Sequence, residues 1–362
     1  MGMRPRATRY RVCYPLWLTT FALMATGVLF VFSASVGYRG AIMTREVMWV
    51  IVGFCVATGV SLINCRDFRH YAAIFYIGAI ASLVIVLLIG QERNGARSWL
   101  GFFGLGIQPS EFAKIAVIFI FGRYLADFEE HRYDIRYYLV SFALLFIPLL
   151  LIMLQPDLGT ALVYLPVVLA MFYVSGTRQS LLALPLCGGV AFFPVLWQVM
   201  TDRQKQRILL TWSPEKDPYH FGYQAIQSKI AIGSGLLTGR GYLQSVQSRL
   251  NFLPERHTDF VFSVIGEEWG FIGSVVVVLL YVSLVATAFY VARRAHDTFG
   301  EVVAVGIGIL FATHALMNVG MAVGLLPIIG VPLPLLSYGG SSFLTSMILI
   351  GVLQSIYGHS IR

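Results

Sequence analysis

Apolar blocks separated by short polar stretches cover most of this 362-residue chain. A helix needs about 20 mostly apolar residues to cross the hydrocarbon core of a bilayer, and ten blocks are long enough to do so. The predicted spans are residues 14–35, 46–63, 71–90, 111–125, 137–154, 158–175, 180–200, 260–292, 300–325 and 337–358. The pattern therefore predicts an all-α polytopic membrane protein, with residues 1–362 forming a single membrane domain.

One long polar interval, residues 201–259, follows the seventh predicted span and is rich in charge, Gln, Gly and Pro. Loops of this length are uncommon unless they are functional, so we expect much of it to be ordered. A helix is predicted near residues 224–232, ended by a left-handed glycine cap in Gly233-Ser234-Gly235. Residues 91–110 and 326–340 are also too polar for lipid, and such backbone needs protein or a wet cavity around it.

The composition indicates a membrane protein, and the distribution of basic residues predicts its orientation in the membrane. Hydrophobic residues make up 57% of the chain and charged residues 12%, against about 25% charged residues in soluble domains. Basic residues concentrate in cytoplasmic loops. With an internal N-terminus, the cytoplasmic side collects Arg4, Arg6, Arg9, Arg11, Arg66, Arg69, Arg123, Arg132, Arg136, Arg178, Arg293, Arg294 and Arg362, and the short outer loops hold Arg39, Arg45, Arg93 and Arg97. Both termini are therefore predicted to be cytoplasmic, with the long 201–259 loop between the seventh and eighth helices outside.

The net charge of +8 reflects this topology and does not indicate a nucleic-acid partner. The four cysteines form no disulfide framework or metal pattern. The chain also lacks a phosphate loop, a Gly-x-Ser-x-Gly elbow and His/Cys zinc spacing. These absences disfavour ATP-driven transport and zinc chemistry.

Several ionisable residues fall where lipid is expected. Glu111 and Lys114 are three positions apart and share one helix face, with Ser110 as the expected N-cap. A structural ion pair explains them, but charge inside a transmembrane helix costs about 2.5–3.5 kcal/mol and usually faces a cavity. The functional explanation is therefore slightly favoured. For Asp157, an N-cap of the sixth span and a place in a site are equally good explanations.

Asp259 stands where the polar loop becomes the eighth span, with Arg256 shortly before it and Thr258 as the expected N-cap. A helix N-terminus and a nearby Arg favour the ionised carboxylate, whereas burial opposes it. A general base must be unprotonated and within reach of its proton, so the setting suits that role. An Asp that only complements the helix dipole is the structural alternative. Deeper in the span, at least one of Glu267 and Glu268 is expected to make a polar interior contact.

Basic residues beside the outer segments could hold a diphosphate, because Arg and Lys pair well with phosphate oxygens. The candidates are Arg97, Lys229, Arg240 and Arg256. Trp99 next to Arg97 could stack on a sugar, but Trp is enriched at membrane interfaces and the residues alone favour an anchor.

Six motifs occur in one order: Gln-Pro-Ser-Glu-Phe-Ala-Lys at 108–114, Gln-Pro-Asp-Leu-Gly-Thr at 155–160, Gln-Ser-Lys-Ile-Ala-Ile-Gly-Ser-Gly at 227–235, Leu-Pro-Glu-Arg-His-Thr-Asp-Phe at 253–260, Gly-Val-Pro-Leu-Pro at 330–334 and Ser-Tyr-Gly-Gly-Ser at 337–341. With the ten predicted helices, this series resembles the SEDS family of shape, elongation, division and sporulation proteins over essentially the whole chain. Arg256 and the motif at 330–334 favour the elongation branch over the division branch.

The resemblance implies an inverting glycosyltransferase that joins lipid II, a disaccharide-pentapeptide on undecaprenyl diphosphate, into β-1,4 glycan strands outside the cytoplasmic membrane. It implies that Asp259 is the general base on the acceptor hydroxyl and that undecaprenyl diphosphate leaves. Matched positions in the family make Glu111, Lys114, Asp157, Lys229, Arg256 and Trp99 substrate-binding candidates, to which Arg97 is added by its place beside Trp99. The expected partner is a class B penicillin-binding protein, a transpeptidase that crosslinks the product.

The charge of the leaving group needs stabilisation where it develops. Lys114, Lys229 and Arg256 are the candidates in the chain. A divalent cation, Mg²⁺ or Mn²⁺, is the alternative, with Asp259 as its candidate ligand but no ligand cluster to establish it.

Two other functions fit some of the same residues. Intramembrane charge and Pro/Gly-broken outer segments also describe transporters, so a lipid II flippase is one alternative. A non-catalytic scaffold for a penicillin-binding protein is the other, and it predicts that Lys114 can be neutralised without loss of cell-wall synthesis. Formation of polymer from lipid II in detergent would favour the enzyme over the flippase, because flipping needs a membrane with two sides.

Overall fold

The computed structural model describes residues 10–35, 40–93, 96–102, 105–131, 134–177, 182–183, 188, 194, 197–198, 200–219 and 221–359. Within them, seven helices are long and apolar enough to cross a membrane. They are α1 (Tyr14–Ser35), α2 (Ala41–Leu62), α3 (Cys65–Ile89), α5 (Ile135–Leu154), α11 (Val261–Arg294), α12 (Thr298–Ala322) and α13 (Gly340–Gly358). The multi-pass architecture predicted from the apolar blocks is confirmed.

Two further helices, α4 (Pro109–Asp127) and α6 (Leu158–Val174), match the fourth and sixth predicted spans. The seventh predicted span, residues 180–200, lies largely outside the described residues. The total of ten therefore stays a prediction.

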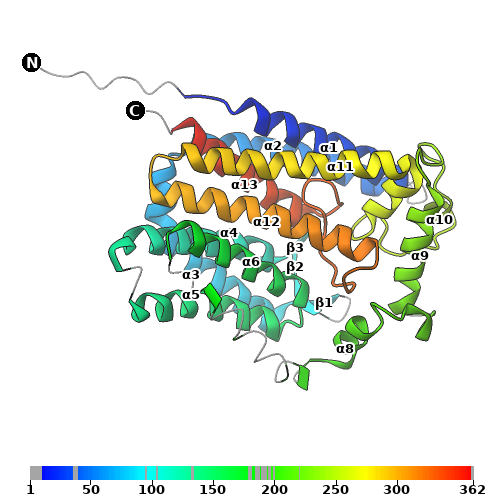
Figure 1. The fold of residues 1–362 in the computed structure, drawn as a ribbon, viewed down its shortest axis with the longest axis horizontal. Helices are drawn as coiled ribbons and strands as arrows, with labels where there is room; N and C mark the ends of the chain where they lie inside the picture. The colour runs from blue at the N-terminus through cyan, green and yellow to red at the C-terminus, as the bar shows by residue number, and fades with distance from the viewer. Residues whose placement is uncertain are drawn as a thin grey trace, which may run out of the picture.

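The long helices run side by side as a bundle (Figure 1). α2 packs on α13, α11 lies against both α1 and α12, and α3 lies against α4. Among these seven membrane-crossing helices, α12 and α13 are the most enclosed, with 72% and 78% of their spans buried inside the protein. The outer faces of α2 and α3 are largely apolar and exposed, as expected for helices that face lipid.

A small antiparallel sheet occupies the polar interval before α4. Its strands are β1 (Gln91–Arg93), β2 (Ala96–Phe102) and β3 (Leu105–Ile107), in the order β1-β2-β3. The segment ends at Gln108, whose backbone N–H donates to Ser341 Oγ at the start of α13 (3.1 Å). This sheet adds to the predicted all-α architecture, and pairing of its backbone groups satisfies them beside the membrane.

The long outer loop contains α8 (Asp202–Leu209), α9 (Phe221–Ser234) and α10 (Val246–Arg249), which lie together at one end of the bundle (Figure 1). The 3-10 turns η1 (Glu129–His131) and η2 (Pro214–Lys216) complete the elements. The expected helix near 224–232 and the expected order in this loop are confirmed.

The predicted glycine cap of α9 is wrong in its detail. The left-handed residue is Leu236 (φ +50°), not a glycine of the Gly-Ser-Gly motif. Gly235 is required for a different reason: a Cβ there would lie 1.9 Å from the carbonyl oxygen of Gly266. Gly270 breaks α11 with φ +64°, and the N–H of Phe271 then donates to the carbonyl of Leu236 (2.8 Å). The loop is thus pinned to the break in α11.

The two glutamates of α11 both make polar interior contacts, as predicted for at least one of them. Glu267 accepts hydrogen bonds from Ser245 Oγ (2.5 Å) and from the backbone N–H of Val246 (2.8 Å), at the start of α10. Glu268 accepts one from Ser33 Oγ on α1. Both carboxylates are buried, so these bonds offset part of the cost of desolvating them.

Candidate active site

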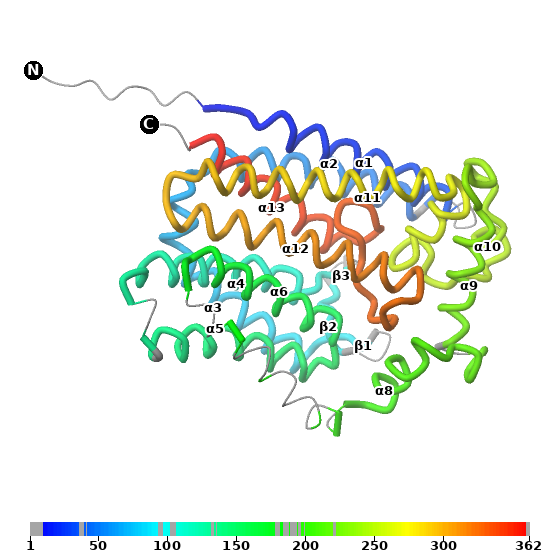
Figure 2. Tube along the Cα trace, viewed as in Figure 1, coloured from blue at the N-terminus to red at the C-terminus, as the bar shows by residue number. Residues whose placement is uncertain are grey.

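A cavity of about 430 Å³ lies at the end of the bundle where α4 and α13 begin. Figures 1 and 2 show α8 and the segment that follows α12 at this same end. The polar side chains that line the cavity are Ser98, Trp99, Gln108, Asp157, Gln204, Arg207, Glu255, Thr258, Asp259, Tyr338, Ser341 and Ser342. They come from segments distant in the sequence, so folding alone brings them together.

Asp259 lies in a tight turn just before α11. The backbone N–H groups of Thr258, Asp259 and Phe260 all donate to the carbonyl of Glu255, at 3.2, 3.1 and 3.3 Å. Glu255 has a left-handed backbone (φ +49°), which aims that carbonyl at all three. The N-cap of α11 is Phe260, and no side chain caps it.

Two expectations about this turn are therefore wrong. Thr258 is not the N-cap of α11, and Asp259 precedes the helix instead of opening it. The hydroxyl of Thr258 donates to Glu255 Oε2 (3.1 Å) and to the Glu255 carbonyl (3.2 Å). The carbonyl of Glu255 already accepts from the N–H of Phe260, which is one of the groups that a Thr258 cap would have served.

Asn318 of α12 is the second support of Asp259. Its Nδ2 donates to the carbonyl of Asp259 and to the carbonyl of Val331, both at 2.8 Å, and the residue is fully buried. Gly330 lies beside the carboxylate with φ +70°, and a Cβ there would be 3.4 Å from Asp259 Oδ2. The sequence analysis missed Asn318. The available signal was an amide inside an apolar helix, where it needs partners.

The carboxylate of Asp259 sits in an environment that favours its neutral form. Burial by the cavity walls is the main cause and the Glu255 carboxylate adds to it, while Arg207 acts in the opposite direction; together they raise the pKa of Asp259 to about 7. Within the described residues, no group donates a hydrogen bond to this carboxylate. It is therefore open to a substrate hydroxyl, with a pKa close to the optimum for a base at neutral pH.

Arg207 reaches the cavity from α8, a helix that begins with a capping box. Thr201 N donates to Gln204 Oε1 (3.0 Å) and Gln204 N to Thr201 Oγ1 (3.4 Å). Gln204 Nε2 also donates to the carbonyl of Pro156 (3.3 Å), which docks the helix on the turn between α5 and α6. Arg207 follows three residues later on the same face. The Thr-x-x-Gln pattern at 201–204 could have revealed the helix from sequence, but not its orientation.

Asp157 is the N-cap of α6 and also lines the cavity. Its side chain caps α6 by accepting from Thr160 N (3.1 Å) and Thr160 Oγ1 (2.8 Å). It also accepts from Gln108 Nε2 (3.1 Å) and lines the cavity. Trp99 of β2 lines the cavity as well, whereas Arg97 is exposed, faces Glu92 across the sheet register and lies outside the lining.

Glu111 and Lys114 lie outside the lining of the cavity. Lys114 Nζ is 2.7 Å from Glu111 Oε1 and 3.1 Å from His314 Nε2, and all three side chains are buried. His314 Nδ1 is 3.3 Å from the carbonyl of Pro332, so Nδ1 carries the proton and Nε2 accepts from the ammonium. Pro332 is part of the cavity wall. Within the described residues, the pair is thus linked to the cavity wall through His314 and Pro332, and its role in substrate binding stays a prediction. The expected N-cap at Ser110 is also wrong, since Gln108 occupies that position.

Lys229 and Arg256 also lie outside the cavity lining, contrary to expectation. Lys229 is exposed on α9, where its side chain passes over Gly324. Arg256 is buried, and its Nε donates to the carbonyl of Ala34 (2.7 Å). Ala34 is in the last turn of α1, where carbonyls lack partners within the helix. Among the described residues, the basic side chain that lines the cavity together with Asp259 is Arg207. Arg240, also exposed, donates to a backbone carbonyl of α9.

A divalent cation held by the protein alone does not fit the described residues. No three His, Cys, Asp or Glu side chains among them gather closely enough to coordinate a metal. Asp157, Glu255 and Asp259 all line the cavity, but Asp157 is already occupied by Gln108 and Thr160.

Comparison with known sequences matches this chain to one family over nearly its full length. The family model described as "Cell cycle protein" (FtsW, RodA and SpoVE) matches residues 14–361. The chain is 38% identical to peptidoglycan glycosyltransferase MrdB of Escherichia coli K12, covering 94% of this chain and 92% of the relative. It is 33% identical to peptidoglycan glycosyltransferase RodA of Treponema pallidum (95% and 96% covered) and 39% identical to a probable peptidoglycan glycosyltransferase FtsW of Trichlorobacter lovleyi (94% and 92% covered).

Solved structures give the same picture. One from a peptidoglycan synthase complex that coordinates polymerization and crosslinking aligns with a TM-score of 0.79, at 28% identity over 96% of this chain and 97% of that chain. The rod shape determining protein RodA of Thermus thermophilus aligns with a TM-score of 0.73, at 27% identity over 98% of each chain.

Proposed function

This chain belongs to the FtsW, RodA and SpoVE family of cell cycle proteins, and from that premise we propose that Asp259 is the base of its glycosyl transfer. The protein is a peptidoglycan glycosyltransferase that polymerises peptidoglycan during cell elongation. The observation that best supports this proposal is the environment of the Asp259 carboxylate. It borders a cavity of about 430 Å³, accepts no hydrogen bond from the described residues and has a pKa of about 7.

The proposed reaction joins two lipid II molecules with inversion at the donor sugar. Asp259 accepts the proton of the acceptor GlcNAc 4-hydroxyl while that oxygen attacks the anomeric carbon of the donor MurNAc. The bond from this carbon to the diphosphate breaks, and undecaprenyl diphosphate leaves with the electron pair. The backbone bonds to Glu255 and Asn318 hold the base in place, which supplies the orientation that such a step requires.

Arg207 is the proposed partner of the leaving diphosphate. It lines the same cavity and acts electrostatically on Asp259, so both groups face one reacting centre. Arg suits this task because its planar fork binds phosphate oxygens bidentately. Lys114, Lys229 and Arg256 lie outside this cavity's lining. A cation would need oxygen ligands from the substrate, and no step is assigned to one.

Trp99 and Asp157 are proposed to contact the sugars. The Trp99 ring is a wall of the cavity, and a flat aromatic face suits the apolar face of a sugar ring. Asp157 offers carboxylate oxygens to sugar hydroxyls but is also needed to cap α6. Trp99→Ala is therefore the cleaner test and should raise the KM for lipid II more than it lowers kcat.

Polymerisation of lipid II by the purified protein in detergent, with its crosslinking partner present, tests this function. Arg207→Gln should lower kcat by about 10²–10³-fold, the loss typical of one donor to a developing charge. Arg203→Gln is the matched control, since Arg203 is exposed on the same helix and outside the lining. Equal activity of both variants would contradict the assignment, as would lipid scrambling by the parent without any polymer.

We further propose a class B penicillin-binding protein as the crosslinking partner, supported by the similarity to a chain of a synthase complex for polymerization and crosslinking. The cavity is proposed to face outward, with both termini cytoplasmic. Arg66, Arg123 and Arg294 lie at helix ends remote from Asp259, as expected for cytoplasmic ends. A membrane-impermeant thiol reagent should label Thr201→Cys from outside intact cells and should leave Arg66→Cys unlabelled, and the reverse pattern would invert the topology.

A further inference from the structure

A second cavity, of about 840 Å³, lies at the opposite end of the bundle from Asp259. Its walls come from the first turns of α3 and α12 and the last turns of α4 and α13, whereas the candidate active site lies where α4 and α13 begin. Since α3, α12 and α13 are membrane-crossing helices, this cavity lies near the depth at which lipid headgroups meet water.

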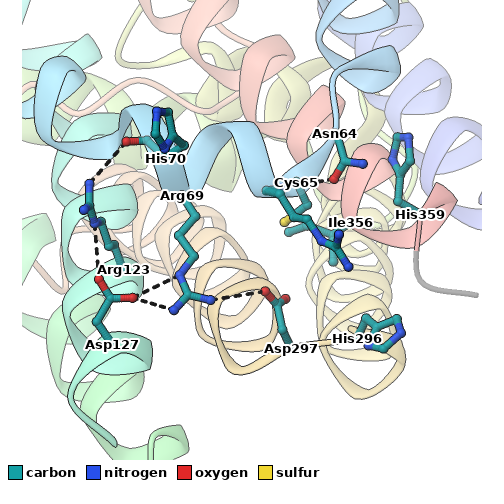
Figure 3. A pocket seen from close by; sticks show the side chains of 11 residues that line it. Asn64, Cys65, Arg69, His70, Arg123, Asp127, His296, Asp297, Ile356 and His359 are labelled. Carbon is teal, nitrogen blue, oxygen red and sulfur yellow. Dashed lines mark hydrogen bonds and ion pairs between the residues drawn. The ribbon is translucent and has the colours of Figure 1, made fainter.

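Three arginines and two aspartates line this cavity. Arg69 and Arg123 converge on Asp127, with Arg69 Nη2 at 2.5 Å and Arg123 Nε at 3.3 Å from its oxygens (Figure 3). Arg69 Nη1 lies 3.9 Å from Asp297. Each aspartate thus has an arginine against it, and the exposed Arg66 is the third cation of the lining. The cavity keeps an excess of positive charge before any of its histidines is protonated.

Several guanidinium N–H groups remain available to a ligand. Each guanidinium has five such groups. Among the described residues, Arg123 Nη2 and the side chain of Arg66 make no hydrogen bond, although Arg123 Nη1 donates to the carbonyl of His70 (3.2 Å). His359 also lines the cavity, and its Nδ1 donates to the carbonyl of Ser355 (2.9 Å).

We propose that this cavity binds a phosphate group, carried by an anionic lipid headgroup or by a soluble phosphate. Phosphate oxygens accept several N–H groups at once and match the arginine fork. Basic pockets between helix ends at a membrane surface suit anionic headgroups in this way. The aspartates do not oppose the ligand, because Asp127 holds Arg69 and Arg123 in place and is itself neutralised by them.

Lipid retention by the purified full-length protein tests the proposal, measured by native mass spectrometry with phosphatidylglycerol and phosphatidylcholine. Arg66→Gln should weaken phosphatidylglycerol binding about five-fold, the effect of one basic residue at an anionic surface, and Arg66→Gln/Arg123→Gln about 25-fold. Arg294→Gln is the control: Arg294 lies at the end of α11, packs over the Tyr290 ring and is outside this lining.

Competition with millimolar inorganic phosphate separates the two sources. Displacement of phosphatidylglycerol would identify a soluble phosphate as the ligand, and continued retention would identify the headgroup; both support a phosphate site. Arg66 is exposed and makes no side-chain hydrogen bond within the described residues, so Arg66→Gln should keep the parent melting temperature. Equal phosphatidylglycerol binding by Arg66→Gln and Arg294→Gln would overturn the proposal.

Discussion

The pH dependence of polymerisation follows directly from the environment of Asp259. A general base works in its ionised form, so kcat/KM should rise as pH increases through the pKa of about 7. With a single ionisation at that pKa, about one tenth of the enzyme is active at pH 6 and about nine tenths at pH 8. An Asp at its ordinary pKa of 3.8 would give a flat profile over this range. Titration of His257 would place a rise at lower pH, because burial lowers the pKa of its imidazole below the ordinary value of 6.5.

Two substitutions at the cavity should move this profile in opposite directions. Glu255→Gln removes a neighbouring negative charge that raises the pKa of Asp259, so the rise should shift to lower pH. Arg207→Gln removes the positive charge that lowers it, so the rise should shift to higher pH, in addition to the loss of kcat. The measured quantity is the pH at which kcat/KM rises, and not the size of the rise.

The assay is the initial rate of lipid II polymerisation between pH 5 and pH 9, with the partner protein present and substrate well below its KM. A profile that is flat from pH 5 to pH 9 would refute the reasoning about Asp259. So would shifts of the same sign in Glu255→Gln and Arg207→Gln, because at least one of the two charges would then not act on the base as described.

Three further predictions concern the supports of the site. Asn318→Leu leaves the buried carbonyls that it served unpaired, so kcat should fall about 100-fold with little change in KM; unchanged kcat would remove its positioning role. Glu267→Ala should lower the stability measured by thermal unfolding in detergent by about 2–4 kcal/mol, because α10 loses its buried acceptor; an unchanged melting temperature would contradict this. Gly235→Ala should prevent stable folding, because its Cβ would lie 1.9 Å from the carbonyl oxygen of Gly266. Gly233→Ala should fold normally, because its Cβ would have no atom within 4 Å, and size-exclusion profiles of the two variants would show the difference.

The apolar pattern predicted the membrane helices well where burial in lipid dominates. The first predicted span, 14–35, coincides with α1 (Tyr14–Ser35). The third began too late, because α3 starts at Cys65 with Asn64 as its cap. Its first turn is polar because it lies near the water interface, so hydropathy alone does not mark that end.

The site was predicted in part, and the errors have one physical cause. Asp259 and Asp157, which were predicted because each stands at a change from polar loop to apolar helix, both line the cavity. Arg256 was expected beside Asp259 because it is close in sequence, but the turn at Glu255 directs it to α1. Arg207 and Asn318 are separated from Asp259 by some fifty to sixty residues, and only the fold places them against it. Sequence spacing predicts which residues share a helix face, not which loop covers a cavity.

The direct test of the central claim is Asp259→Asn, which keeps the shape of the side chain and removes its basicity. The variant should insert into the membrane with the parent melting temperature, since within the described residues no hydrogen bond depends on the carboxylate. Its rate of lipid II polymerisation, measured with the partner protein present, should fall by about 10²–10⁴-fold. A correctly folded Asp259→Asn protein that polymerises lipid II at the parent rate would contradict the account.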